Sequence, residues 1–176
     1  MKAPKTRIAT QLVLVVSILA TIACDRVTKH IATETLAGSP ARSYLGDTIW
    51  IGYAENAGGF LGLGANLPPR IRIGLFTVGL GLLLLASVAA AIRLRWRGWP
   101  LFGFSLFVAG GASNWVDRVV RGSVVDFMNV GIGPLRTGIF NVADVAIMLG
   151  LGILVLAELL PQGGDESSSR LRGGTA

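Results

Sequence analysis

Four long, mostly uncharged stretches dominate the pattern of hydrophobic and polar positions along the chain. They cover residues 8–24, 73–92, 98–116 and 139–160 and contain 17 to 22 residues each. An α-helix rises about 1.5 Å per residue, so twenty residues cover about 30 Å, the thickness of a bilayer's hydrocarbon core. The pattern therefore predicts four transmembrane helices, of which the first and third are only marginally long enough.

The connections 25–72 and 117–138 hold most of the remaining polar residues and are predicted to lie on one side of the membrane. Within them, residues 48–53 are β-branched and aromatic, as in a strand, and residues 123–130 are a second candidate. Pro68-Pro69 precedes the second helix, which is consistent with proline at a helix start. We therefore expect a small sheet and a loop subdomain at one membrane surface.

Lys and Arg residues near the helix ends predict the orientation. They are densest before the first helix, in residues 93–97, and in the tail 161–176, which is rich in Gly and Ser and is expected to be disordered. The loops on the other side carry the same number of Lys and Arg residues, but these are spread over two longer loops. The orientation is therefore predicted from the density of basic residues and not from their number. We expect a single integral-membrane domain over residues 1–160, with both termini cytoplasmic.

Composition agrees with a membrane protein, because 52% of the residues are hydrophobic, 15% are charged, and the mean hydropathy is +0.62. The net charge of +6 does not indicate nucleic-acid binding, because the basic residues lie at the ends of apolar stretches and form no aromatic-laced patch. One cysteine and one histidine exclude a disulfide framework and argue against a zinc site.

The first 24 residues have a second interpretation, a lipoprotein signal peptide that ends before Cys24. However, the apolar stretch is long for such a signal, and the residues that follow do not resemble a tether. Asp25 and Lys29 would instead share one face of a continuing helix. We favour the helix, with Cys24 as a small buried residue.

Asp126 and Asp144 are the least expected residues in this apolar chain, since each lies beside or inside a bilayer-length stretch. An ionisable group there costs a few kcal/mol and indicates a functional site. Two such acids at one membrane depth predict a carboxylate pair that shares a proton, the arrangement of aspartic proteolysis. The simpler alternatives are a surface acid for Asp126 and a helix-dipole partner for Asp144. Serine chemistry is disfavoured, because no Ser/Asp pattern surrounds His30.

Other polar residues accompany the two acids. If the third helix continues, Asn114, Asp117 and Arg118 lie on one of its faces, where they are expected to form a structural polar network. Asn141 lies three residues before Asp144 and is well suited to cap the fourth helix.

Five short motifs in this order resemble those of bacterial lipoprotein signal peptidase, also called signal peptidase II. They are Asp25-Arg-x-Thr-Lys29, Asn56-x-Gly-Gly-Phe60, Gly110-Gly-x-x-Asn114-x-x-Asp117-Arg118, Val-Val-Asp126-Phe and Phe-Asn141-x-Ala-Asp144. The likeness extends over about residues 8–160. The 18-residue spacing between the last two aspartates is its most specific part.

The resemblance implies an all-α inner-membrane aspartic endopeptidase with four transmembrane helices and a small periplasmic β-sheet. Such an enzyme cleaves diacylglyceryl-modified prolipoproteins before the lipidated cysteine, near the periplasmic face, and works with membrane lipid but without cofactor, metal or nucleic acid. Asp126 and Asp144 then match the catalytic pair. Asn114, Arg118 and Asn141 match residues that line the site. Asp117, Asp25 and Lys29 match a supporting network, and Asn56 matches a loop residue that contacts the substrate.

The chain departs from the family pattern in two places. Its Asn56 loop is one residue shorter than the common Asn-Thr-Gly-Ala-Ala-Phe, and Ser113 and Trp115 replace the usual Gly and Leu around Asn114. These changes leave the aspartate pair intact and concern the loop that faces the substrate.

Two further functions are compatible with acids inside a membrane. A small multi-span transporter or proton-relay protein also uses them, although no internal repeat of the kind common in transporters is found here. A non-catalytic assembly factor is the other alternative. Replacing either aspartate would block prolipoprotein processing only in a peptidase.

Overall fold

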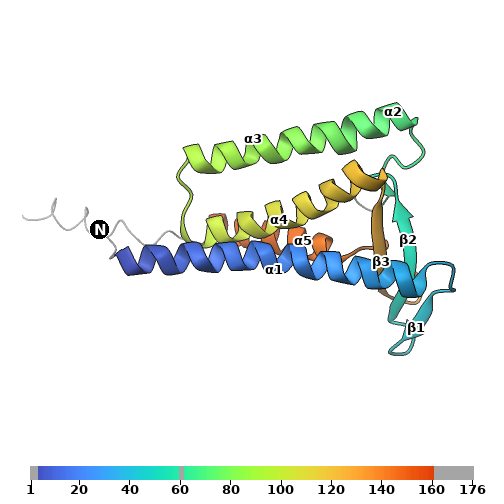
Figure 1. Cartoon of the computed structure of the whole chain (residues 1–176). Helices are drawn as coiled ribbons and strands as arrows, with labels where there is room; N and C mark the ends of the chain where they lie inside the picture. Colours follow the sequence, from blue (N-terminus) through green and yellow to red (C-terminus); the bar gives the residue numbers. More distant parts are fainter. Residues whose placement is uncertain (1–3, 60–61, 161–176) are drawn as a thin grey trace, which may run out of the picture.

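Long helices run side by side, and a small sheet crosses one end of them (Figure 1). The computed structural model describes residues 4–59 and 62–160. Its helices are α1 (Pro4–Leu36), α2 (Pro69–Arg72), the π-helical segment η2 (Ile73–Gly79), α3 (Leu80–Arg93), α4 (Gly98–Arg121) and α5 (Val142–Leu159). Because α2, η2 and α3 follow one another without a break, they form one rod.

Three of these helical segments are long and apolar enough to cross a membrane, so the protein is a multi-pass membrane protein. They are Gln11–Leu36, Pro69–Arg93 and Val142–Leu159. The helix α4 has 24 residues but is not among them. Its second half carries glycines and polar residues that are buried against the other helices, which lowers its hydropathy. Composition thus supports three of the four predicted spans.

Small residues let α4 and α5 pack closely. A Cβ atom on Gly150 of α5 would lie 2.5 Å from the carbonyl oxygen of Gly103 and 2.6 Å from the backbone nitrogen of Phe107, both on α4. Only glycine fits at such a distance, which is how small residues usually act in membrane helix pairs. A Cβ atom on Gly110 of α4 would likewise collide with the carbonyl oxygen of Ala143, so the close packing also holds the first turn of α5 beside the middle of α4.

The sheet is antiparallel, with strand order β1-β2-β3-β4. Its strands are β1 (Arg42–Tyr44), β2 (Ile49–Asn56), β3 (Val124–Ile132) and β4 (Leu135–Arg136). The outer part of α1 covers the sheet, where Ala32 and Leu36 form a buried cluster with Val125 and Phe127 of β3. The two predicted strands are confirmed, and this core attaches the sheet to the helices.

Two helices continue further than the sequence indicated. The first helix does not end at Cys24 but continues to Leu36, and α4 extends to Arg121 before Gly122 ends it with φ of 76°. The polar residues just after Cys24 and Val116, which the sequence placed in loops, therefore lie on helices. The expectation that Cys24 is buried was wrong, because its side chain is exposed on the outer face of α1. The predicted tail 161–176 lies outside the described residues.

Candidate active site

Backbone pairing brings Asp126 and the start of α5 together. Asp126 lies in β3, opposite Ala54 of β2. The chain then turns back, and Phe140 pairs with Met128 through hydrogen bonds of 2.8 and 2.9 Å in both directions. Asn141, the residue after Phe140, therefore lies beside Asp126 although 15 positions separate them.

Asn141 also begins α5 with a capping box. Its side-chain oxygen accepts from the Asp144 backbone N–H at 3.0 Å, and the Asp144 Oδ2 accepts from the Asn141 N–H at 3.1 Å. The sequence prediction that Asn141 caps this helix is confirmed. This reciprocal pair, which satisfies two unpaired helix donors, fixes the Asp144 carboxylate at the first turn.

The two acids meet across Asn141. Its Nδ2 donates to Asp126 Oδ1 at 2.6 Å, while its backbone N–H contacts Asp144. Asp126 Oδ2 accepts from Asn56 Nδ2 at 3.1 Å, and Asp144 Oδ1 accepts from Asn114 Nδ2 at 2.9 Å. Neutral amide groups thus orient both carboxylates, and each keeps lone pairs for a further partner.

Burial and a like charge act on Asp126, whose side chain is 3% exposed. Burial, followed by the negative charge of Asp144, raises the pKa of Asp126 to about 6, although the hydrogen bonds from Asn56 and Asn141 act in the other direction. Asp126 therefore binds a proton far more tightly than a solvated aspartate does.

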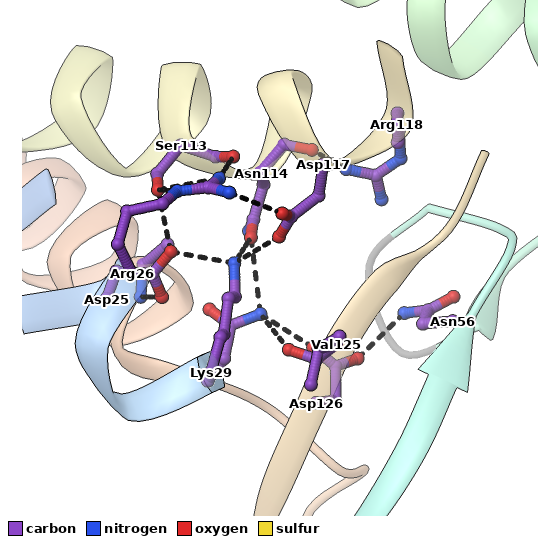
Figure 2. A network of polar contacts seen from close by, with 12 residues as sticks. Asp25, Arg26, Lys29, Asn56, Ser113, Asn114, Asp117, Arg118, Val125 and Asp126 are labelled. Carbon is purple, nitrogen blue, oxygen red and sulfur yellow. Dashed lines mark hydrogen bonds and ion pairs between the residues drawn. The ribbon is translucent and has the colours of Figure 1, made fainter. Parts of the chain in front are cut away.

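Next to Asp126 lies a cluster of charged residues from α1 and α4 (Figure 2). Lys29 Nζ lies 2.7 Å from Asp25 Oδ2 and 2.7 Å from Asp117 Oδ2, and all three side chains are buried. Arg26 Nη1 pairs with Asp117 Oδ1 at 2.7 Å. The remaining Asp25 oxygen accepts from the Ala143 backbone N–H at 2.9 Å. Two cations balance two anions, and the cluster ties α1 to α4 and α5.

Asn114 joins this cluster to the two acids. Its Oδ1 accepts from Lys29 Nζ at 2.7 Å and from Asn141 Nδ2 at 3.2 Å. With its oxygen held by these donors, its Nδ2 must point toward Asp144. The charged cluster thus sets the orientation of an amide that contacts one of the two acids.

Arg118 and Asn56 form the side of the site near the loop that follows β2. Arg118 Nη2 donates to the Gly58 carbonyl at 2.7 Å, and its Nη1 donates to the Asn114 carbonyl at 3.2 Å. Its buried Nε has no hydrogen-bond partner among the described residues. Asn56 turns the loop through its Oδ1, which accepts from the Gly58 N–H at 3.0 Å.

A cavity of about 520 Å³ opens from the two acids into the space between the helices. Its polar end is formed by Asn56, Asn114, Arg118, Asp126 and Asp144. The rest is apolar and comes from η2, α3, α4 and α5, with Leu75, Phe76, Leu83, Phe107, Ile147, Met148 and Leu151 among its lining residues. The cavity therefore offers a carboxylate pair to a ligand that is largely apolar.

All nine residues selected from the sequence lie in this one region: Asp25, Lys29, Asn56, Asn114, Asp117, Arg118, Asp126, Asn141 and Asp144. Sequence reasoning missed Arg26 and Ser113. The Ser113 hydroxyl donates to Asp25 Oδ2 at 2.7 Å, and its Oγ and carbonyl oxygen accept from Arg26. Arg26 follows Asp25 directly, and a basic residue beside a buried acid was the available signal.

Comparison with known proteins gives consistent results. The family model described as signal peptidase (SPase) II matches residues 17–160. The lipoprotein signal peptidases of Moorella thermoacetica and Caldicellulosiruptor bescii are 32% and 31% identical to the chain, over 82% and 85% of it and 91% of each relative. That of Leifsonia xyli subsp. xyli is 29% identical over 96% of the chain and 77% of its own length. A solved bacterial membrane enzyme shares the fold with a TM-score of 0.73, at 23% identity over 93% of both chains.

Proposed function

The chain belongs to the signal peptidase II family of aspartic peptidases, and from this premise we propose which bond it cleaves and which residues act. It removes signal peptides from prolipoproteins. The substrate is a diacylglyceryl-modified prolipoprotein, cleaved on the N-terminal side of its lipidated cysteine. The observation that carries the proposal is the contact of Asn141 with both Asp126 and Asp144 at the polar end of an apolar cavity.

Asp126 and Asp144 are the catalytic pair in this proposal. Asp126 holds the shared proton, because burial and the charge of Asp144 raise its pKa to about 6. Asp144 acts as the base that takes a proton from the attacking water, and Asp126 donates to the oxyanion that forms on the scissile carbonyl. The amide groups of Asn56, Asn114 and Asn141 hold the carboxylates in position for both transfers.

The cavity suits a substrate with apolar segments on both sides of the cleaved bond. Its walls from η2, α3 and α5 are mostly aliphatic and aromatic, so a signal peptide and an acyl chain would both be removed from water there. Arg118 lines the same cavity, and its buried Nε has no hydrogen-bond partner in the part of the chain that the structure describes, so we assign this donor to a substrate carbonyl.

For the membrane arrangement we propose four spans in the bacterial inner membrane, with α4 as the fourth. The Arg-rich turn between α3 and α4 lies at the end of the molecule away from the sheet (Figure 1). The positive-inside rule then places this turn and both termini in the cytoplasm, and the sheet and the catalytic pair near the periplasmic face. Residues 1–160 would form one peptidase domain.

The test is cleavage of a purified diacylglyceryl prolipoprotein by the wild type and by the Asp126→Asn and Asp144→Asn variants. Each should lose about 10³-fold or more in kcat/KM, because each removes a proton donor or acceptor. Asp47→Asn, a matched change at an exposed acid, should leave cleavage unchanged. A transporter or proton-relay function would instead be indicated if both variants cleaved normally while ion flux changed.

A further inference from the structure

Trp115 of α4 is bonded to the π-helical segment η2. Its indole Nε1 donates to the Thr77 carbonyl at 2.7 Å. The indole also lies against the backbone at Gly81, where an added Cβ would lie only 2.7 Å from Nε1. One hydrogen bond and one close contact, made possible by a glycine, thus hold the η2 and α3 rod against α4. Single π-helical turns occur frequently at functional sites.

Phe76, the neighbour of Thr77 in η2, reaches the loop that follows β2. An added Cβ on Gly59 would lie 2.8 Å from Phe76 Cε1, and one on Gly64 would lie 3.1 Å from Phe76 Cζ. The ring therefore fits against the backbone at two glycines of this loop. The same ring lines the cavity together with Asp126.

Gly59 in turn fixes the amide of Asn56. Asn56 Nδ2 donates both to the Gly59 carbonyl at 3.0 Å and to Asp126 Oδ2 at 3.1 Å. A shift of Gly59 would move this amide away from the carboxylate. A continuous series of contacts therefore runs from the Trp115 indole to Asp126.

We infer that Trp115 is a positioning residue, which holds η2 so that Phe76 supports Gly59 and keeps the Asn56 amide on Asp126. The inference rests on the proposed function, because its consequence is measured on the catalytic pair. It assigns a role to Trp115 outside the carboxylate pair, and it names Phe76 as the residue that transmits the effect.

The experiment measures kcat/KM against pH with a diacylglyceryl prolipoprotein for the wild type, Asn56→Ala, Trp115→Phe and the double variant. Asn56→Ala removes a donor that favours the ionised Asp126, so the limb on which activity falls with rising pH should move up by about one pH unit. Trp115→Phe keeps an aromatic ring but loses the N–H. This variant should move the same limb of the pH profile in the same direction, by a smaller amount. The other charged groups that face Asp126 remain unchanged, namely Asp144 on α5, Lys29 on α1 and Arg118 on α4.

The double variant should show the same limb as Asn56→Ala alone, because Trp115 acts through Asn56. Trp99→Phe, a matched change at a residue 71% exposed near the start of α4, should leave the profile unchanged. If Trp115→Phe does not fold, Phe76→Leu interrupts the same series of contacts and should shift the same limb.

A uniform loss of rate at all pH values, or shifts that add in the double variant, would overturn the inference. The proposed function fails separately, if Asp126→Asn retains activity.

Discussion

Two groups of aspartates lie side by side in this protein, and they differ in what surrounds them. Asp25 and Asp117 are buried against Lys29 and Arg26, so each has a cation within 2.7 Å. Asp126 and Asp144 receive their hydrogen bonds from asparagine amides and from one backbone N–H. A cation adds a compensating charge beside a buried carboxylate, whereas a neutral amide orients the carboxylate without compensating its charge.

This difference shows why residue type alone does not identify a catalytic acid. Three of the four aspartates are buried and Asp144 is half-buried, and Asn114 links the two groups by accepting from Lys29 and donating to Asp144. Under the proposed function the partners decide the role: balanced charges would give a structural cluster, and neutral donors with a second acid nearby would give a pair that can exchange a proton.

The largest loss of stability is expected from Lys29→Met, which removes the cation shared by Asp25 and Asp117 and so disrupts the charge-balanced group of aspartates. Breaking a buried ion pair from one side leaves uncompensated charge, and the free energy of unfolding should fall by about 3–5 kcal/mol. Unfolding in detergent micelles measures this loss. The double variant Asp25→Asn/Lys29→Met should recover part of it. Equal stability of the Lys29→Met variant and the wild type would contradict the charge-balance argument.

Asp126→Asn is expected to change the free energy of unfolding by a smaller amount and in the opposite direction. The pKa of this carboxyl is about 6 in the folded protein against an ordinary value of 3.8, so it destabilises the fold as pH rises from about 4 to 6. Removing it should stabilise the protein above pH 6 by about 1–2 kcal/mol, since the adjoining cavity weakens the full effect of the shift. Below pH 4 the two proteins should be alike.

Thermal unfolding of the wild type and Asp126→Asn across this pH range tests the prediction. The matched change Asp117→Asn should destabilise the protein instead, because that acid is paired with two cations. If both substitutions shifted stability in the same direction at pH 7, the two groups of aspartates would not differ as described.

The smallest effect is expected from Ser113→Ala, which removes one hydroxyl from the charged cluster. Asp25 keeps its bonds to Lys29 and Ala143, so the cost should be about 1 kcal/mol, with little change in cleavage. Ser105→Ala is the control, because among the described residues that buried hydroxyl of the same helix bonds within its own turn alone, to the Leu101 carbonyl. Equal melting temperatures for the two variants would show that Ser113 contributes nothing to the cluster.

Much of the fold could be predicted from the sequence because bilayer-length apolar stretches and turn residues are local signals. The positions of the helices and the two central strands follow from such signals, as does the cap at Asn141. The ends of α1 and α4 could not be predicted in this way, because the charges at Asp25, Lys29 and Asp117 resemble the end of a membrane span. Those charges are instead paired with each other across helices, a long-range fact that spacing does not reveal.

The candidate site was predictable in its members and not in its connections. Spacing placed Asn141 beside Asp144, but the contact of Asn141 with Asp126 depends on the pairing of Phe140 with Met128. Likewise, nothing local to Trp115 indicates that its indole reaches Thr77 in another helix. Such contacts depend on tertiary packing, which a linear pattern cannot specify.

The bond between the Asp25 carboxylate and the Ala143 backbone has a consequence for biosynthesis, since 118 positions separate these two residues. The ribosome delivers α1 long before α4 and α5 exist, so Asp25, Arg26 and Lys29 first meet the membrane without their later partners. During this interval we expect the outer end of α1 to stay near the lipid–water interface, because water can solvate the charges there. It would then reach its final depth only after the last helix has been translated.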